Sequence, residues 1–417
     1  MLLEQILASE NLQRAWKRVK QNKGAAGIDG LTVDHYPNWA SAHWEKVHLG
    51  LKRGYYCPLP VKRVEIPKSN GGIRLLGIPC VNDRVIQQAI AQCLQAIIDP
   101  DFSDHSHGFR PERSAHHAVK AVQMRIKQGY HYAVDIDLSK FFDKVDHDLL
   151  MNRVSKWVDD KRVLALIGKY LRAGVSIRGK IEPSPRGVPQ GGPLSPLLAN
   201  IMLDDLDRYL ENKGYAFSRY ADDFVISVKS FSEGERIKAE VITFLETLKL
   251  PINTEKSQVV PVRKLCFLGF VFKRNKIIWS PKALVNFKHR IREITGRSWG
   301  VSWGYRYREL RRYISGWINY FGLSEFYRPV PELDQWIRRR VRMCYLKQWR
   351  KPRTRIRNLM RLGVSTKLAI FLGLSSKGYY RLAKTKAVQL GINNDWLKAQ
   401  GLVSVKDKWV KFHYPNG

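Results

Sequence analysis

The stretch FSRYADDFVISV, residues 217–228, decides the fold because it places an acidic turn between two apolar strands. Apolar residues on both sides of Ala221 and Asp222 predict a β-hairpin whose turn lies at these two residues. Asp222 and Asp223 would then stand at the tip, where neighbouring carboxylates repel each other unless a cation lies nearby. An Asp-Asp pair in a turn is usually only a turn, so its interpretation depends on the surrounding sequence.

A second strand ends in acidic residues upstream of the hairpin. The run YHYAVDIDL, residues 130–138, predicts a short buried strand that could lie beside it. Asp135 or Asp137 would then join the hairpin acids. Two or three aspartates at adjacent strand ends suit two divalent cations that activate a hydroxyl and hold a triphosphate. The pattern predicts nucleotidyl transfer and leaves Asp135 and Asp137 as alternatives.

The charge of the chain indicates the substrate class. The 417 residues include 72 Lys and Arg against 37 Asp and Glu, a formal net charge of +35. Such an excess is self-repulsive unless a polyanion neutralises it, which favours nucleic acid over a membrane surface. The five scattered cysteines form neither a disulfide framework nor a zinc pattern. Without a membrane-length apolar run or a basic signal-peptide lead, we expect a cytoplasmic protein without membrane contact.

Changes in periodicity and charge divide the chain. Residues 1–60 have helical spacing, and residues 61–80 alternate as two strands around a turn at residues 69–72. Residues 187–210 run from a Gly/Pro-rich loop into a helix, on whose surface we place Asp204-Asp205. Residues 281–360 carry 20 Lys and Arg against 5 acids, with five tryptophans. These predict helices that face nucleic acid, with their aromatic residues mainly in the core.

Taken together, these segments resemble the reverse transcriptase/maturase proteins encoded by bacterial group II introns. Eight blocks follow the family's order over nearly the whole chain, which makes the resemblance far more specific than YADD alone. The blocks are NKGAAGIDG (22–30), VEIPKSNGGIRLLGIP (64–79), HSHGFRPERSAHHA (105–118), VDIDLSKFFDKVDHDLL (134–150), RGVPQGGPLSPLLANIMLDDLD (186–207), RYADDFVI (219–226), NTEKS (253–257) and FLGF (267–270), followed by SWGVS (298–302) and GWINYF (316–321).

The resemblance implies an α+β, right-hand polymerase fold with fingers, a palm containing an antiparallel sheet, and a helical thumb. Residues 1–60 would form an N-terminal extension and residues 61–280 the reverse transcriptase fingers and palm. Residues 281–360 would form the thumb/maturase helical domain. Residues 361–417 would be a basic segment that could bind DNA.

The resemblance also assigns the metal ligands that the residues alone leave open. It selects Asp137, with Asp222 and Asp223, as the catalytic metal ligands, and makes Asp135 a neighbour. The backbone carbonyl of Leu138 would be a further ligand. Two Mg²⁺ ions are implied, which Mn²⁺ could replace.

Four further residues are implied to bind the incoming dNTP. Lys68 and Arg74 flank the fingers turn and would bind the triphosphate. Phe142 would pack under the sugar and exclude a 2′-hydroxyl, although the adjacent Phe141 could instead face the site. Gln190 would contact the nucleotide, while the glycines around it let the backbone approach the substrate.

Lys256 would donate a proton to the leaving pyrophosphate, or else contact phosphate as an exposed lysine. Contacts to nucleic acid are expected from six arginines: Arg110, Arg311, Arg312, Arg338, Arg339 and Arg342. The aromatic residues between the thumb arginines suggest a helical surface that packs on one side and faces a duplex backbone on the other.

The implied function is that of an RNA-directed DNA polymerase of a group II intron, which also binds intron RNA to assist splicing and mobility. Its partners would be intron RNA, an RNA template, a DNA or RNA primer, dNTPs and target DNA. The sequence shows no paired-cysteine endonuclease, which resembles the compact class C form. The alternatives are a free-standing group II-like reverse transcriptase in DNA repair or phage defence, a polymerase-inactive RNA-binding factor, and an RNA-templated RNA polymerase.

Overall fold

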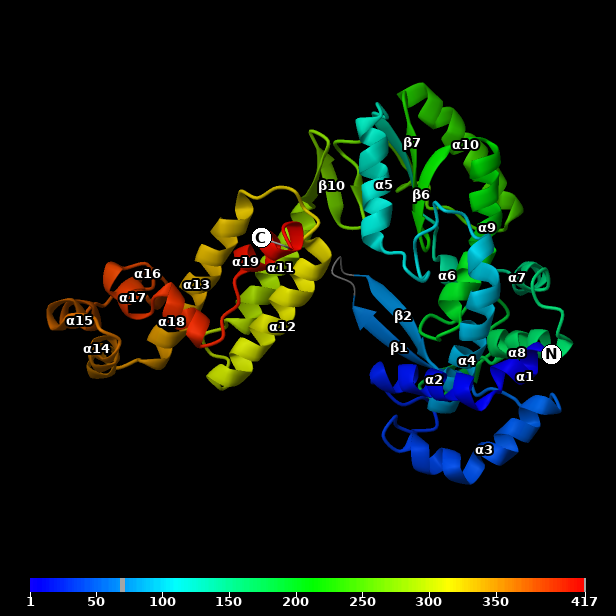
Figure 1. Cartoon of the computed structure of the whole chain (residues 1–417), viewed down its shortest axis with the longest axis horizontal. Helices are drawn as coiled ribbons and strands as arrows, with labels where there is room; N and C mark the ends of the chain where they lie inside the picture. Colours follow the sequence, from blue (N-terminus) through cyan, green and yellow to red (C-terminus); the bar gives the residue numbers. More distant parts are fainter. Residues whose placement is uncertain (68–71, 416–417) are drawn as a thin grey trace. The chain divides into compact units, whose positions relative to one another are not determined.

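The computed structural model describes residues 1–67 and 72–415, which form two compact units, Met1–Val262 and Arg263–Gly417 (Figure 1). Each unit contains helices together with at least one sheet, which confirms the predicted α+β class. Within the described residues, none of the helices is long and apolar enough to cross a lipid bilayer.

The central sheet of the first unit has the order β6-β7-β3-β8, and each strand is antiparallel to its neighbour. The strands are β3 (Tyr132–Ile136), β6 (Ala216–Tyr220), β7 (Asp223–Val228) and β8 (Gln258–Pro261). Tyr220 pairs with Asp223, which confirms the predicted two-residue turn at Ala221 and Asp222. Ala221 has a φ of 58°, the left-handed conformation found in tight hairpin turns.

Helices cover this sheet because its strands are buried and apolar. The helices α5 (Ala115–Lys127) and α10 (Phe231–Thr247) pack against its strands (Figure 1). Both begin at a serine whose hydroxyl accepts a hydrogen bond from a backbone N–H of the first turn, Ser114 in α5 and Ser230 in α10. Such N-caps satisfy a donor that the helix itself leaves unpaired.

The helix α9 (Ser195–Asn212) contacts β6 and is buried on most of its faces. Its buried residues include acids as well as apolar side chains. The interpretation of Asp204 as helix surface is therefore wrong, because Asp204 is only 2% exposed and its carboxylate accepts from Arg208 Nε at 2.6 Å. The local pattern did not reveal this burial, because it cannot show which faces of a helix the rest of the fold covers.

A second sheet in this unit has the order β2-β1-β4-β5. It contains β1 (Val61–Pro67), β2 (Ile73–Ile78), β4 (Val175–Ile177) and β5 (Lys180–Glu182). The antiparallel pair β1 and β2 confirms the two strands predicted for residues 61–80. Lys68 and the turn residues up to Gly71 lie outside the described residues.

The remaining helices of the first unit surround these sheets. They are α1 (Leu2–Ile6), α2 (Ser9–Gln21), α3 (Tyr36–Lys52), α4 (Val81–Ile98), the 3₁₀ turn η1 (Asp99–Asp101), α6 (Phe141–Lys144), α7 (His147–Val154) and α8 (Lys161–Arg172). The helical spacing of residues 1–60 is thus confirmed, and α2 packs against α4.

The second unit begins with a three-stranded sheet and continues as helices. Its elements are β9 (Cys266–Phe267), β10 (Phe270–Lys273), β11 (Lys276–Trp279), α11 (Pro281–Ile294), α12 (Trp303–Phe321), α13 (Pro329–Gln348), α14 (Pro352–Arg361), α15 (Thr366–Gly373), α16 (Tyr379–Leu382), α17 (Lys386–Gly391), α18 (Asn394–Ala399) and α19 (Val405–His413). The ring of Trp317 packs 4.4 Å from that of Phe287 and 4.8 Å from that of Trp279, as expected for core aromatics. The final helix, α19, packs back on α12 and α13.

Candidate active site

The structure brings the predicted acids to one edge of the central sheet. Asp222 lies in the turn between β6 and β7, Asp223 begins β7, and Asp137 follows the last residue of β3. Because Ile136 pairs with Phe224 in the antiparallel register, the next residue along β3 and the preceding one along β7 continue side by side. Asp137 and Asp223 are therefore neighbours across the two strands.

Three acids at this edge, Asp135, Asp222 and Asp223, lie in an environment that disfavours their charged forms. Burial, followed by the charges of Asp222 and Asp137, raises the pKa of Asp223 to about 6. Burial, followed by Asp223 and Asp137, also raises the pKa of Asp135 to about 6. The pKa of Asp222 is raised by burial and partly restored by the nearby charge of Arg74. Mutual repulsion of this kind would be relieved by a bound cation.

A loop after α10 fixes the backbone around Asp137. The Asp137 N–H donates to the Ser257 hydroxyl at 3.1 Å, and its carbonyl accepts from Asn253 N at 2.8 Å. Lys256 Nζ lies 3.6 Å from a carboxylate oxygen of Asp137. Leu138 forms an antiparallel bridge with Ile252. The hydrogen bonds to the loop are made by the neighbours of Leu138, through the carbonyl of Asp137 and the N–H of Ser139. The carbonyl of Leu138 therefore points away from this loop.

The donor set fits a hard divalent cation. Three carboxylates and a backbone carbonyl are oxygen ligands, which Mg²⁺ prefers, and Mg²⁺ also keeps positions for water and phosphate. In the described part of the chain, no group of three or more His, Cys, Asp or Glu side chains lies close enough together to hold a metal ion, so the carboxylates of Asp137, Asp222 and Asp223 do not converge on one point. The fit to Mg²⁺ is therefore one of donor chemistry.

Three of the predicted nucleotide-binding residues are described, and two of them touch. Arg74 Nε, on β2, donates to Gln190 Oε1 at 3.2 Å, and the backbone N–H of Gly77 donates to the Gln190 carbonyl at 2.7 Å. Phe142 is half-buried and lines a cavity of about 330 Å³ together with Gln190. Phe141, the alternative, is 2% exposed and lies in the core.

The glycines around Gln190 allow close packing within the protein. Gly187 and Gly191 have positive φ values of 88° and 122°. A Cβ at Gly187 would collide with the carbonyl of Phe142, and a Cβ at Gly191 with the carbonyl of Gly77. In the described structure the two glycines therefore let the loop around Gln190 pack closely on α6 and β2. We had expected them to let the backbone approach a substrate.

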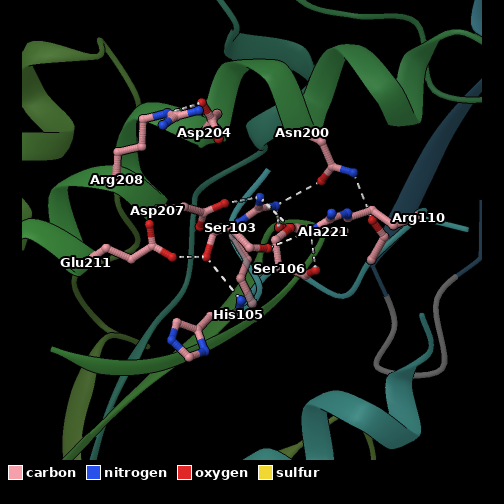
Figure 2. A network of polar contacts seen from close by, with 12 residues as sticks. Ser103, His105, Ser106, Arg110, Asn200, Asp204, Asp207, Arg208, Glu211 and Ala221 are labelled. Carbon is pink, nitrogen blue, oxygen red and sulfur yellow. Dashed lines mark hydrogen bonds and ion pairs between the residues drawn. The ribbon is translucent and has the colours of Figure 1, made fainter. Parts of the chain in front are cut away.

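Sequence reasoning missed the buried network that holds the hairpin. Arg219, directly before Tyr220, is fully buried and forms an ion pair with Asp207 of α9, to which its Nε also donates at 2.7 Å. Its guanidinium further donates to Ala221 O at 2.9 Å, Asn200 Oδ1 at 3.0 Å and Ser106 Oγ at 2.8 Å. Figure 2 shows these partners converging from α9, from the loop before α5 and from the turn.

The six predicted nucleic-acid arginines differ in their availability. Arg110 has a side chain that is 3% exposed, pairs with Asp99 at 2.9 Å and donates to backbone carbonyls. Arg342 is buried and donates to Ile392 O at 2.7 Å. Neither guanidinium is available to a phosphate, because both are enclosed by protein partners.

The other four arginines reach solvent at least in part. Arg311 and Arg312 are exposed, while Arg338 and Arg339 are half-buried. Arg312 pairs with Glu309 at 2.6 Å, and Arg339 stacks over the ring of Tyr380 at 3.8 Å. Arg311 and Arg338 line one cavity of about 680 Å³ in the second unit, together with Lys398, Lys406 and Lys408.

Comparison with known proteins places two family models on the chain. Residues 66–272 match the model described as reverse transcriptase (RNA-dependent DNA polymerase), and residues 284–363 match the group II intron, maturase-specific domain. The first range lies mostly in the first unit and contains the three candidate aspartates, and the second range lies in the second unit.

Individual proteins are also similar to the chain. Protein YkfC of Escherichia coli (strain K12) is 35% identical over 318 residues, covering 66% of this chain and 82% of that protein. The group II intron-encoded protein LtrA of Lactococcus lactis subsp. cremoris is 31% identical over 326 residues, covering 61% of this chain. The chain spans about half of LtrA, 54% of its length. A solved structure, a partial Cas6-RT-Cas1--Cas2 complex, is 26% identical with a TM-score of 0.38, covering 62% of this chain and 43% of that one.

The buried ion pair yields a stability prediction. Arg219→Met leaves the Asp207 carboxylate buried without its partner, so we expect a loss of about 3–5 kcal/mol in the free energy of unfolding. Urea denaturation of the full chain measures it. Arg236→Met removes an exposed arginine from its pair with Glu240 and should cost less than about 0.5 kcal/mol. Equal losses in the two variants would contradict the structural role of Arg219.

The raised pKa values yield a pH prediction. Folded Asp223, with a pKa of about 6, binds its proton more tightly than an unfolded aspartate with a pKa of about 3.9. Its contribution to stability is therefore complete below about pH 4 and is lost as pH rises through about 6. We expect millimolar Mg²⁺ to raise the thermal unfolding temperature by a few °C at about pH 8, and by much less at about pH 5.

Asp223→Asn should reduce this difference between the two pH values, since it removes one of the repelling charges. The exposed Asp159→Asn serves as the matched control and should behave as the wild type does. A Mg²⁺ shift of equal size at both pH values would show that these acids do not form the cation site.

Proposed function

The chain belongs to the group II intron reverse transcriptase and maturase family, and on this premise we propose that it copies RNA into DNA at the Asp137, Asp222 and Asp223 site. The observation that carries the proposal is the placement of these three carboxylates at one sheet edge, in a chain of net charge +35. A protein that only bound RNA would gain nothing from clustered acids beside a polyanion.

The three aspartates would hold the divalent cations, with the Leu138 carbonyl as a further ligand. Two bound Mg²⁺ ions, or Mn²⁺ in their place, would lower the pKa of the attacking 3′-hydroxyl and neutralise charge on the triphosphate. Lys256, 3.6 Å from Asp137, stands where it could donate a proton to the pyrophosphate leaving group.

The nucleotide would be positioned by residues on three elements. Arg74 on β2 supplies a charge to the triphosphate, and its contact with Gln190 places the two side chains together. Phe142 lines the cavity beside Gln190, where a ring packed against the sugar would exclude a 2′-hydroxyl. Lys68 stays a proposal from the sequence, because it lies outside the described residues.

We assign binding of intron RNA, and so the splicing and mobility role, mainly to the second unit. The cavity lined by Arg311, Arg338 and three lysines, which outnumber its three aspartates, suits phosphate groups. Arg312 and Arg339 reach solvent on the same two helices. The segment after residue 360 ends in α19, which packs on α12 and α13, so it would extend this basic helical surface. The other partners would be an RNA template, a DNA or RNA primer, dNTPs and target DNA, met in the cytoplasm.

Removal of one proposed ligand tests the active site. Asp222→Ala should lower templated primer extension in Mg²⁺ by at least about 10³-fold, because the site loses charge at its centre. The same variant should bind intron RNA with wild-type affinity. Asp159→Ala, an exposed aspartate beside another aspartate, is the control and should extend normally. Extension that survived in Asp222→Ala would show that the metal site lies elsewhere.

A second variant tests the sugar contact. Phe142→Ala should raise incorporation of rNTPs relative to dNTPs by about 10-fold or more, since the 2′-hydroxyl gains room beside Gln190. Competition between the two nucleotides on one primer–template measures this ratio. Phe141→Ala should lower stability by about 3–5 kcal/mol and leave the ratio unchanged, because Phe141 packs in the core. The reverse pattern would assign the sugar contact to Phe141.

A further inference from the structure

Phe109, in the loop between η1 and α5, has a large apolar side chain that is partly exposed to solvent. Its backbone has a φ of 58°, in the left-handed region, and its side chain is 45% exposed. Bulky residues rarely adopt this conformation, which costs on the order of 1–3 kcal/mol and often marks a functional position. Burial cannot account for this residue, since nearly half of its surface remains in water.

The backbone on both sides of Phe109 is fixed by the buried network. His107 N donates to Arg219 O at 2.8 Å, and Asn200 Nδ2 donates to Gly108 O at 2.8 Å. The carbonyl of Phe109 accepts from Gln95 Nε2 at 3.3 Å. A Cβ at position 108 would collide with the backbone of Ala221, so the loop packs directly on the hairpin turn.

The residue after Phe109 completes this anchoring. Arg110 donates to the carbonyls of Ser103 and Ser106 at 2.5 and 3.0 Å (Figure 2). It also pairs with Asp99. The loop is therefore rigid on either side of Phe109. A rigid loop that directs one ring outward suits a contact with something outside the protein.

The residue Phe109 lines a groove of the first unit, and its ring also lies near the hairpin. Its centroid is 6.1 Å from that of Tyr220, the residue before the turn. The groove has a volume of about 1160 Å³ and is lined by an exposed basic face of α2, polar amides of α4, and the start of α9. The lining residues used here are Arg14, Lys17 and Arg18 of α2, Gln88 of α4, and Pro196 of α9.

The charge of the groove favours an anionic strand. Arg14, Lys17 and Arg18 are exposed on one face of α2, and the acid in the lining, Asp99, is already paired with Arg110. Exposed cations that track a backbone, together with an aromatic ring for a base, are the features that bind single-stranded nucleic acid. A duplex would not present a base face to the ring, because its bases are stacked on one another.

We infer that Phe109 is a stacking platform for an unpaired base of the template strand, whose phosphates lie along the basic face of α2. The inference rests on the proposed polymerase function, since a copying enzyme holds its template unpaired next to the reacting base pair. Phe109 is thus a positioning residue: it fixes the template beside Tyr220, while the acids at the turn carry out the chemistry.

The test compares two complexes in the absence of dNTPs. One is a primer–template with a single-stranded 5′ template overhang, and the other is the same duplex with a blunt end. Phe109→Ala should weaken binding of the overhang complex by about 5- to 100-fold and leave the blunt complex unchanged. Phe109→Trp should stay within about twofold of the wild type, because it keeps an aromatic face.

Two further variants separate stacking from strain and fold. Phe109→Gly relieves the left-handed backbone, so it should weaken overhang binding as alanine does without lowering the thermal unfolding temperature. Phe231→Ala removes another exposed phenylalanine of the first unit, 51% exposed on α10, and should bind as the wild type does. Lys17→Ala and Arg18→Ala should each lower the salt dependence of overhang binding by about 0.7 in log–log slope.

Equal weakening of the overhang and blunt complexes by Phe109→Ala would overturn the inference, as would equal overhang binding by Phe109→Ala and Phe109→Trp. Primer extension by the wild-type protein from the same preparation tests the proposed function separately. A protein that extends primers but shows no overhang effect at position 109 would retain the polymerase assignment and lose the stacking platform.

Discussion

The buried ion pair between Arg219 and Asp207 is the interaction on which the active-site geometry depends. Two charges removed from water are costly unless every remaining donor is satisfied. Arg219 meets this condition through Asp207 and Asn200 on α9, Ser106 in the loop before α5, and the carbonyl of Ala221 in the turn. One side chain thereby ties three segments that are distant in sequence, and the hairpin tip cannot shift without breaking buried hydrogen bonds. Such a pair adds specificity of position more than it adds net stability.

The charge at the central turn is opposite in sign to the charge of the chain as a whole. The chain as a whole is strongly basic, which suits a polyanionic substrate, yet its central turn concentrates acids whose pKa values burial and mutual repulsion raise. A rigid hairpin prevents these acids from moving apart, so their repulsion persists until a cation compensates it. The same constraint that fixes the turn therefore also prepares the site for a divalent ion. Lys256 offers a weaker, monovalent compensation beside Asp137.

Much of this arrangement could be predicted from the sequence, because hairpins and strand ends follow local rules. The turn at Ala221 and Asp222 follows from the apolar residues on both sides of it, and the strand β3 follows from its own apolar run. The antiparallel sheet that joins them was implied only by the family resemblance. The choice between Asp135 and Asp137 could not follow, since residues two apart in a strand face the same side. Nor could local patterns separate buried from exposed charges, since Asp204, Arg110 and Arg342 are all buried. The partners of Arg342, Ile392 and Asn394, come from a segment 50 and 52 positions further along the chain. The sequence does show Arg219 as an arginine within an apolar strand. Its structural role becomes clear only from its partner Asp207 on α9, which the sequence does not indicate.

Burial distinguishes aromatic residues that pack in a core from those that could contact a ligand. In the second unit Trp317 packs among Phe287 and Trp279, so its position in a basic segment reflects a core and not a stacking surface. Phe109 has the opposite setting, because its flanking backbone is buried and bonded while its ring is not. Since the loop of Phe109 and the turn of Asp222 share Arg219 as an anchor, their separation is fixed by the fold. A strand held at Phe109 would therefore sit at a constant distance from the acids, which is the geometric requirement for copying one base at a time.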